Sequence, residues 1–168
     1  MSQAPWALGV LTLSDKGAAG QRADVSGPAA RDLLLAALPG ADVRHLALVA
    51  DERPAIEAIL RAWADTEHLA LIVTTGGTGL APRDVTPEAT LAVLDYQVPG
   101  LAEAMRAASL AHTPLAMLSR AVAGVRGRTL IVNLPGSPKA VRECLAVIGP
   151  ALPHALEKLA GDPTDCAP

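Results

Sequence analysis

The chain has 168 residues, the size of one domain that can bury a complete hydrophobic core. Apolar residues make up 51% of it, which excludes a disordered protein. The net charge is −3 at pH 7, and only Trp6, Trp63 and Tyr96 are aromatic. The chain therefore offers neither a basic surface for a polyanion nor a stacking platform for single-stranded nucleic acid, and we expect no nucleic-acid partner.

Cysteine content and the amino terminus indicate where the protein acts. Cys144 lies in a helical pattern and Cys166 near the carboxyl terminus, an arrangement that suggests neither a disulfide framework nor a zinc site. The first six residues lack the positive segment and apolar core of a secretory signal. No uncharged apolar stretch reaches the roughly 18 residues of a membrane span. We expect a soluble cytoplasmic protein with no membrane partner.

The first half of the chain is predicted to alternate strands with helices. Short apolar runs that fit strands occupy residues 7–14, 42–50 and 69–75. A helix is predicted over 26–38, with Ser26 as its N-cap and Pro28 in its first turn. A second helix is predicted over 54–66, where apolar residues recur at helical spacing.

The second half begins with a glycine-rich loop at 76–85, and Thr86 is the predicted N-cap of the helix that follows. The remaining pattern predicts a helix at 101–111, strands at 115–125 and 129–134 around a turn at 126–128, and final helices after 135–138. We expect residues 162–168 to form a flexible tail. The alternation predicts a single α/β domain over residues 1–168, with helices on both faces of a mostly parallel sheet and one antiparallel strand near residue 127.

Ligands of open α/β sheets bind beyond the carboxyl ends of the strands. In this chain those ends carry hydroxyls, carboxylates and glycines, at Ser14–Asp15, Asp51, Thr74–Gly79 and Asn133–Gly136. Because parallel strands end at one edge, we expect these segments to converge there.

The loop Thr74–Gly79 (TTGGTG) is the sharpest local signal. Its glycines let an anion approach the backbone amides, and its threonine hydroxyls can donate to phosphate oxygens. A tight strand-to-helix turn without any ligand explains the same residues equally well. The loop is not a Walker P-loop, because no Gly-Lys-Ser/Thr follows it, and its glycine spacing differs from that of a Rossmann fingerprint.

Asp51 and Asp84 are the candidate carboxylates for a Mg²⁺ ion that neutralises a triphosphate. Their alternative roles are a helix N-cap for Asp51 and a turn residue for Asp84. Asp15 resembles the acid after the first strand of a receiver domain, but the third predicted strand ends in Thr-Thr-Gly-Gly where a receiver carries its phosphorylated aspartate.

Other polar residues are less specific. No two histidines have metal-ligand spacing. Four arginines are expected to flank the ligand edge and would suit a phosphate-rich substrate: Arg83, Arg120, Arg126 and Arg128.

The run Thr74–Thr90 (TTGGTGLAPRDVTPEAT) strongly resembles the signature of the molybdopterin-binding domain family, which includes the bacterial proteins MogA and MoaB, the G domain of gephyrin and a domain of the plant enzyme Cnx. Further matching segments are Gly9–Asp15, Thr113–Gly127, Leu130–Pro138 and Gly149–Leu156. The resemblance therefore covers nearly the whole chain.

The resemblance implies a three-layer α/β/α fold with a mixed sheet, assembled as a homotrimer. It also implies an adenylyl transfer, in which the terminal phosphate of molybdopterin attacks the α-phosphorus of ATP with Mg²⁺ and releases pyrophosphate. The expected partners are then molybdopterin, ATP and a molybdenum insertase that receives the product.

By matching position, the resemblance assigns Asp51 and Asp84 to metal-assisted catalysis. The implied nucleotide side comprises Ser14, Gly76, Gly77 and Thr78. Positions associated with nucleotide or pterin binding are Ser109, Ser119 and Asn133, and the expected binding set is completed by Thr75, Gly79, Pro135 and Gly136.

The alternative is a MoaB-like pterin-binding or assembly protein without catalytic activity. The segments 81–90 and 99–106 look more like the MogA and gephyrin pattern. The presence of both Asp51 and Asp84 also favours an enzyme, because a protein that only binds the pterin has no need of a metal-coordinating pair.

Overall fold

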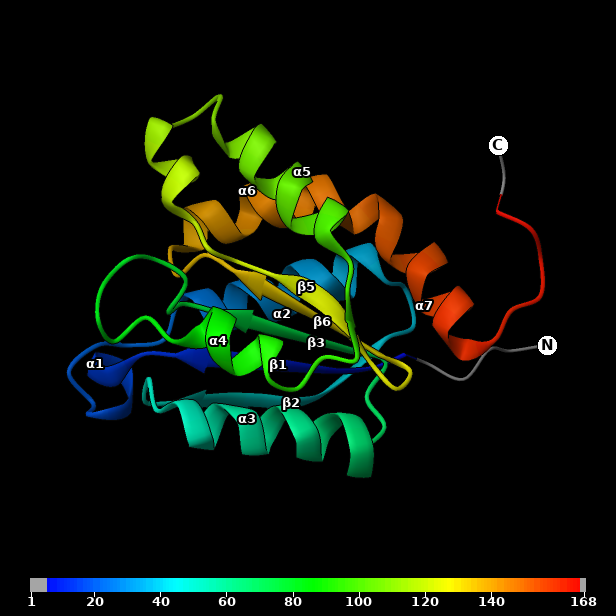
Figure 1. Ribbon diagram of the computed structural model, residues 1–168, viewed down its shortest axis with the longest axis horizontal. Helices are drawn as coiled ribbons and strands as arrows, with labels where there is room; N and C mark the ends of the chain where they lie inside the picture. The colour runs from blue at the N-terminus through cyan, green and yellow to red at the C-terminus, as the bar shows by residue number, and fades with distance from the viewer. Residues whose placement is uncertain (1–5, 167–168) are drawn as a thin grey trace.

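The computed structural model describes residues 6–166 (Figure 1). These residues contain a six-stranded sheet in the order β2-β1-β3-β6-β5-β4. The strands are β1 (Ala7–Leu13), β2 (Asp42–Val49), β3 (Leu71–Thr75), β4 (Tyr96–Gln97), β5 (Ala123–Arg126) and β6 (Thr129–Leu134). β1, β2, β3 and β6 are parallel, β5 is antiparallel to β6, and β4 is antiparallel to β5. Only β5 runs against the others, which confirms the predicted sheet.

Helices cover both faces of this sheet and complete the three layers (Figure 1). They are α1 (Asp15–Ala18), α2 (Ser26–Ala37), α3 (Arg53–Arg61), the π-helix η1 (Ala62–Thr66), α4 (Thr86–Leu91), α5 (Pro99–Ser109), the 3₁₀ helix η2 (Pro114–Leu118), α6 (Pro138–Ile148), the 3₁₀ helix η3 (Gly149–Ala151) and α7 (Leu152–Ala160). In the part of the chain that the structure describes, no helix has the length and apolar character needed to cross a bilayer.

Alternate residues of the central strands build two separate cores. Leu8 and Val10 of β1 face a cluster formed by α2, α5, α6 and α7. Leu11 and Leu13 of the same strand face the opposite cluster, formed by α3, η1 and α4. Because β1 and β3 are buried on both faces, their sequences read as continuous apolar runs, as the prediction of central parallel strands required.

The predicted strand over 115–125 is wrong in its first half. Residues 114–118 form η2, and the strand β5 begins only at Ala123. Pro114 occupies the first turn of η2, and the Thr113 side chain accepts a hydrogen bond from the backbone N–H of Leu115. The large apolar side chains that suggested a strand there are exposed, since Leu115 is 68% and Met117 is 66% exposed. The pattern therefore reflected an apolar surface segment.

Two predicted helix caps are also wrong. The side chain of Asp24, and not that of Ser26, accepts the backbone N–H of Gly27 at 2.9 Å at the start of α2. Thr86 makes no cap, because its hydroxyl donates to the carbonyl of Gly76. At the other end of the chain, residues 162–166 form no helix or strand, and residues 167–168 of the expected tail lie outside the described residues.

The topology determines where a ligand site can form. The chain passes from β1 to β2 on one side, and β3 then pairs with β1 on the other side. The strand order therefore reverses between β1 and β3, and a crevice forms beyond the carboxyl ends of strands at such a point. The glycine-rich loop leaves β3 at this position.

Candidate functional site

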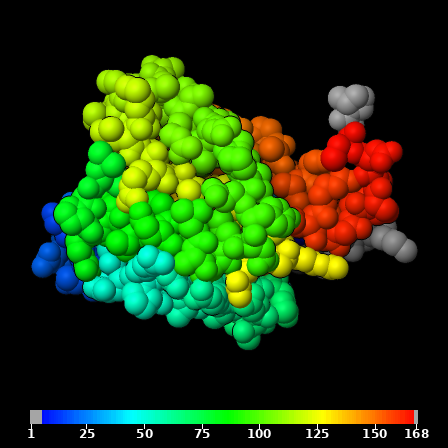
Figure 2. All heavy atoms as spheres, in the orientation of Figure 1, coloured from blue at the N-terminus to red at the C-terminus, as the bar shows by residue number. Residues whose placement is uncertain are grey.

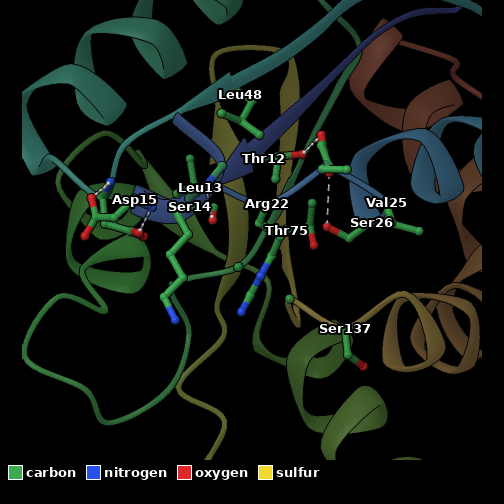
Figure 3. Close-up of a pocket in the computed structure, with 18 of the residues that line it drawn as sticks. Thr12, Leu13, Ser14, Asp15, Arg22, Val25, Ser26, Leu48, Thr75 and Ser137 are labelled. Carbon is green, nitrogen blue, oxygen red and sulfur yellow. Dashed lines mark hydrogen bonds between the residues drawn. The ribbon is translucent and has the colours of Figure 1, made fainter. Parts of the chain in front are cut away.

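Two cavities open beside the glycine-rich loop at the carboxyl edge of the sheet. The first cavity, of about 640 Å³, is lined by the end of β1, the segment from Asp15 to Ser26, the start of the glycine-rich loop and the start of α6 (Figure 3). The second cavity, of about 400 Å³, lies between the rest of that loop, α5, η2 and α6. Gly76 and Gly77 line the first cavity, and Thr78 and Gly79 line the second, so the loop separates the two.

The structure brings all but one of the predicted site residues to these cavities. The first cavity receives Ser14, Asp51, Thr75, Gly76, Gly77, Asp84 and Gly136. The second receives Thr78, Gly79, Ser109, Ser119 and Pro135. The sequence prediction of a shared edge therefore agrees with the structure, although the residues divide between two spaces.

Asn133 is the exception, because its side chain lies inside the protein. It is fully buried in β6 and donates to the hydroxyls of Thr74 and Thr90, each at 2.9 Å. Its side-chain oxygen accepts the backbone N–H of Val122 at 3.2 Å. The side chain thus joins β3, β6, α4 and the segment before β5, and it lines neither cavity.

The ends of β1 and β2 are tied together by a reciprocal pair of hydrogen bonds. The backbone N–H of Asp15 donates to Oδ2 of Asp51, and the backbone N–H of Asp51 donates to Oδ1 of Asp15, both at 3.0 Å. Asp51 is therefore not the N-cap of α3, which begins after Glu52 without a side-chain cap. Parallel pairing of β1 with β2 makes this arrangement possible, because it brings both strand ends to one level.

Arg83 completes this corner from the glycine-rich loop. Its guanidinium makes two bonds of 2.9 Å to the carboxylate of Asp15 and one of 2.7 Å to Glu52. These contacts hold the pKa of Asp15 below its ordinary value. The neighbouring Asp84 accepts the backbone N–H of Ala81 at 2.9 Å, which is the turn role that the sequence offered as the alternative to metal binding. Asp84 also lines the first cavity.

One oxygen of Asp51 is left without a partner. Asp51 is only 9% exposed, and its Oδ1 is buried and accepts no hydrogen bond. Burial raises the pKa of Asp51 above its ordinary value, the hydrogen bond from Asp15 opposes this effect, and the negative charges of Asp15 and Asp84 add to it. A buried, unpaired carboxylate oxygen is costly to maintain in the absence of a cation or a donor.

The carboxylates at this edge fit a Mg²⁺ ion that arrives with a phosphate ligand. Within residues 6–166 there is no group of three or more side chains placed to hold a metal by themselves. Mg²⁺ is typically bound by one or two carboxylates together with substrate phosphates and water. Asp51, with its unpaired oxygen, and Asp84 would supply the protein ligands of such an ion.

The loop glycines are required by close packing. Gly76 has a φ of +97°, and a Cβ there would lie 2.4 Å from the carbonyl oxygen of Leu13. Gly77 has a φ of +67°, and a Cβ there would lie 2.3 Å from the hydroxyl of Thr86 and 2.9 Å from Oδ1 of Asp51. No side chain fits at either position, so the glycines are needed whether or not a ligand binds.

The first cavity also contains basic residues that were not predicted from the sequence. Lys16 and Arg22 both line it, and Figure 3 shows the Arg22 side chain extending into the space between Ser14 and Ser137. Their only signal was the presence of two cations in the loop after the first strand. A cavity lined by cations as well as carboxylates suits a phosphate chain accompanied by a metal ion.

Two arginines predicted at the ligand edge lie at the opposite edge. Arg126 binds Asp65 at 2.6 and 2.9 Å, and Arg128 lines a different cavity near His68. The reason is the direction of β5, because an antiparallel strand ends where its parallel neighbours begin. Arg83 and Arg120 do lie at the carboxyl edge, as predicted.

The second cavity differs from the first in its chemistry. Apolar side chains dominate its walls: Leu80, Ala102, Met105, Leu115, Leu118 and Ala121. A smaller set of polar groups interrupts them, including Ser109, Thr113 and Ser119. A wall of this composition suits a flat heterocycle, which has apolar faces and polar edges.

The fold is that of an α/β protein with two cavities beside a glycine-rich loop at the carboxyl edge of its sheet. A family model described as a probable molybdopterin binding domain matches residues 9–154. A molybdopterin adenylyltransferase from Helicobacter pylori strain J99 is 45% identical over 155 residues, which are 92% of this chain and 88% of that protein. The chain therefore belongs to the molybdopterin-binding domain family.

Solved structures of this family superpose closely. The molybdopterin biosynthesis enzyme MoaB from Thermus thermophilus is 56% identical, with a TM-score of 0.86 over 95% of this chain and 99% of that chain. A structure of MogA is 43% identical, with a TM-score of 0.82 over 91% of this chain and 99% of that chain. The three-layer fold and its mixed sheet are thus shared with both named subgroups.

The raised pKa of Asp51 predicts how stability depends on pH. Its folded-state pKa exceeds its unfolded-state value, so Asp51 ionisation costs stability as pH rises through these values and the cost persists above them. The substitution Asp51→Asn removes this cost. We expect the melting temperature of the variant, relative to the parent, to rise as the pH in EDTA is increased above about 4, the ordinary pKa of an aspartate.

The control is Asp32→Asn, at an exposed carboxylate on α2 that lines neither cavity. Its melting temperature relative to the parent should not show the same rise. A difference between Asp51→Asn and the parent that stays constant with pH would contradict the pKa assignment.

Proposed function

We propose that the protein is a molybdopterin adenylyltransferase that transfers AMP from ATP to molybdopterin and releases pyrophosphate. The observation that carries this proposal is the placement of Asp51 and Asp84 beside a glycine-rich loop that separates a polar cavity from an apolar one. A two-substrate transfer needs two adjoining spaces, and the loop that lies between the cavities carries Asp84. The adenylyltransferase named above, at 45% identity over most of both chains, supports the same reaction.

In this proposal the first cavity binds the nucleotide. Lys16 and Arg22 would balance the charge of the phosphate chain, which would lie beside Gly76 and Gly77 on the cavity wall. Asp51 and Asp84 would hold Mg²⁺, which neutralises the triphosphate and the leaving pyrophosphate. A volume of about 640 Å³ is within the range typical of small-molecule sites.

The second cavity binds the pterin in this proposal. Its apolar walls would cover the ring faces, and Ser109 and Ser119 would bond to the ring edges. The terminal phosphate would then extend past Thr78 and Gly79 towards the nucleotide. There a phosphate oxygen attacks the α-phosphorus of ATP, a new phosphorus–oxygen bond forms, and the bond to the β-phosphate breaks with the electron pair leaving on pyrophosphate.

The second candidate is a MoaB-like protein that binds the pterin without adenylylating it. The observation that favours it is the 56% identity to a structure named MoaB. That protein is itself described as a molybdopterin biosynthesis enzyme, so its name does not separate the candidates. Incubation with molybdopterin and ATP, followed by mass spectrometry for adenylylated molybdopterin, distinguishes them directly.

Three further features belong to this proposal. The protein would act in the cytoplasm, where ATP is supplied, and would deliver its product to a molybdenum insertase. It would also assemble as a homotrimer. Support for assembly comes from the apolar side chains exposed around η2, the yellow-green segment at the upper left of Figure 2, where Leu115 is 68% and Met117 is 66% exposed.

The substitutions Asp51→Asn and Asp84→Asn are each expected to lower single-turnover adenylyl transfer by about 10²-fold or more, since a ligand to a charge-stabilising metal contributes several kcal/mol to the transition state. Both variants should still fold and bind molybdopterin, because neither side chain lines the second cavity. The matched control Asp32→Asn should turn over like the parent. Rates within about threefold of the parent for both site variants would rule out the assignment.

Removal of Mg²⁺ should weaken nucleotide binding. With the cation absent, Asp51 and Asp84 face a triphosphate of the same sign. Calorimetric titration of ATP with Mg²⁺ and with EDTA measures the effect, which we expect to be at least about tenfold in Kd. Equal affinity in the two buffers would remove the metal from the proposal.

The proposed homotrimer predicts a particle three times the 17.1 kDa mass of the chain. Light scattering after size exclusion, at micromolar protein, measures it. Substitution of Leu115 and Met117 together by Ser should lower the measured mass if the η2 segment lies in the interface. A monomer mass for the parent would exclude the assembly.

A further inference from the structure

Arg120 makes an unusual number of contacts with the glycine-rich loop. Its Nε donates to the carbonyl of Gly79 at 2.8 Å, and its Nη2 donates to the carbonyl of Asp84 at 2.7 Å. Its backbone N–H donates to the carbonyl of Thr78 at 2.9 Å. Its Nη1 forms an ion pair with Glu88 in the first turn of α4. One residue therefore holds both ends of the loop.

The positions that Arg120 joins belong to different cavities. Gly79 lines the second cavity, whereas Asp84 lines the first. Ser119 and Ala121, the neighbours of Arg120 in the chain, both line the second cavity. A displacement of Ser119 by a ligand would therefore be passed through one side chain to the loop that carries Asp84.

The segment that carries Arg120 is held from its other side as well. Arg106 of α5 donates to the carbonyl of Ala121 at 2.9 Å and to that of Ser119 at 3.4 Å. The segment is thus bonded to α5 on one side and to the glycine-rich loop on the other. Such a segment is restrained by hydrogen bonds at both sides, so movement at Ser119 is coupled to movement of the loop.

The contacts need the shape of an arginine. A guanidinium presents several N–H donors in a fixed plane, so it can bind two carbonyls and a carboxylate at once. Lysine keeps the positive charge but concentrates its donors on one atom, and it cannot reach all three acceptors. The second oxygen of Glu88 is buried without a partner, which makes the pairing with Arg120 the main compensation for that charge.

We propose that Arg120 is a positioning residue that couples the two cavities, so that a ligand in the second cavity fixes Asp84 in the first. The inference rests on the proposed function for the identity of the two ligands. By thermodynamic linkage the effect is reciprocal, and a nucleotide in the first cavity strengthens pterin binding by the same factor. The coupling would favour adenylyl transfer only when both substrates are present.

The test measures this coupling at equilibrium. The Kd of the Mg²⁺ complex of α,β-methylene-ATP, whose bond between the α- and β-phosphates is not cleaved, is determined calorimetrically with and without saturating molybdopterin. We expect molybdopterin to tighten binding by about fivefold or more in the parent. In Arg120→Lys we expect this coupling factor to fall below about twofold. The Kd of the nucleotide analogue measured without molybdopterin should change by a smaller factor than the coupling does.

Arg126→Lys is the matched control. Like Arg120, Arg126 binds a carboxylate and a backbone carbonyl. Its partners are Asp65, which it contacts through two nitrogens, and Val93, and they lie at the opposite edge of the sheet. Its substitution should leave the coupling factor at the parent value. Retained coupling in Arg120→Lys, or an equal loss in Arg126→Lys, would overturn the proposal.

A second measurement uses only the parent protein, in case the Arg120→Lys variant does not fold. Molybdopterin alone should slow amide hydrogen exchange in residues 78–88, including positions that do not line the second cavity. Binding of both ligands without coupling and without this protection overturns the role of Arg120 but leaves the proposed function standing. Failure of the parent to bind molybdopterin or the nucleotide analogue overturns both.

Discussion

The close packing of the glycine-rich loop against the ends of β1 and β2 is the constraint on which both cavities depend. Gly76 lies so close to the carbonyl of Leu13 that a Cβ would come within 2.4 Å of it. Because the loop stays against the sheet there, it leaves space on each of its sides. The first cavity then forms between the loop and the segment after β1, and the second forms between the loop, α5, η2 and α6.

Electrostatics at the first cavity follow from the same packing. Asp15, Asp51 and Asp84 are gathered at one corner, and Arg83 neutralises mainly Asp15. Asp15 can therefore act as a fixed acceptor for the backbone of Asp51, while Asp51 keeps one oxygen unpaired. The corner has an excess of negative charge that a divalent cation would balance. A nucleotide without a divalent cation would meet that charge with only Lys16 and Arg22 of the same cavity to offset it.

Continuous apolar runs were enough to predict the central strands, because both faces of β1 and β3 are buried. The order of strands and helices predicted the ligand edge, whereas the short helices α1 and η2 were not predicted. Local patterns failed where tertiary contacts decide. Thr86 has the pattern of a helix cap, but its hydroxyl bonds to the carbonyl of Gly76. Asn133 has the position of a strand-end ligand, but its side chain makes three hydrogen bonds inside the protein. Arg126 was misplaced because the direction of β5 depends on pairing, which the sequence does not specify locally.

The steric role of Gly76 and Gly77 bears on how a signature of this kind should be read. Any side chain at either position would displace the backbone of β1 or the side chains of Asp51 and Thr86, whatever the loop binds. A descendant that lost the proposed reaction would still need both glycines to fold. The glycine pattern therefore identifies an architecture. The reaction is better indicated by residues that the packing does not require, such as Lys16 and Arg22 on the wall of the first cavity.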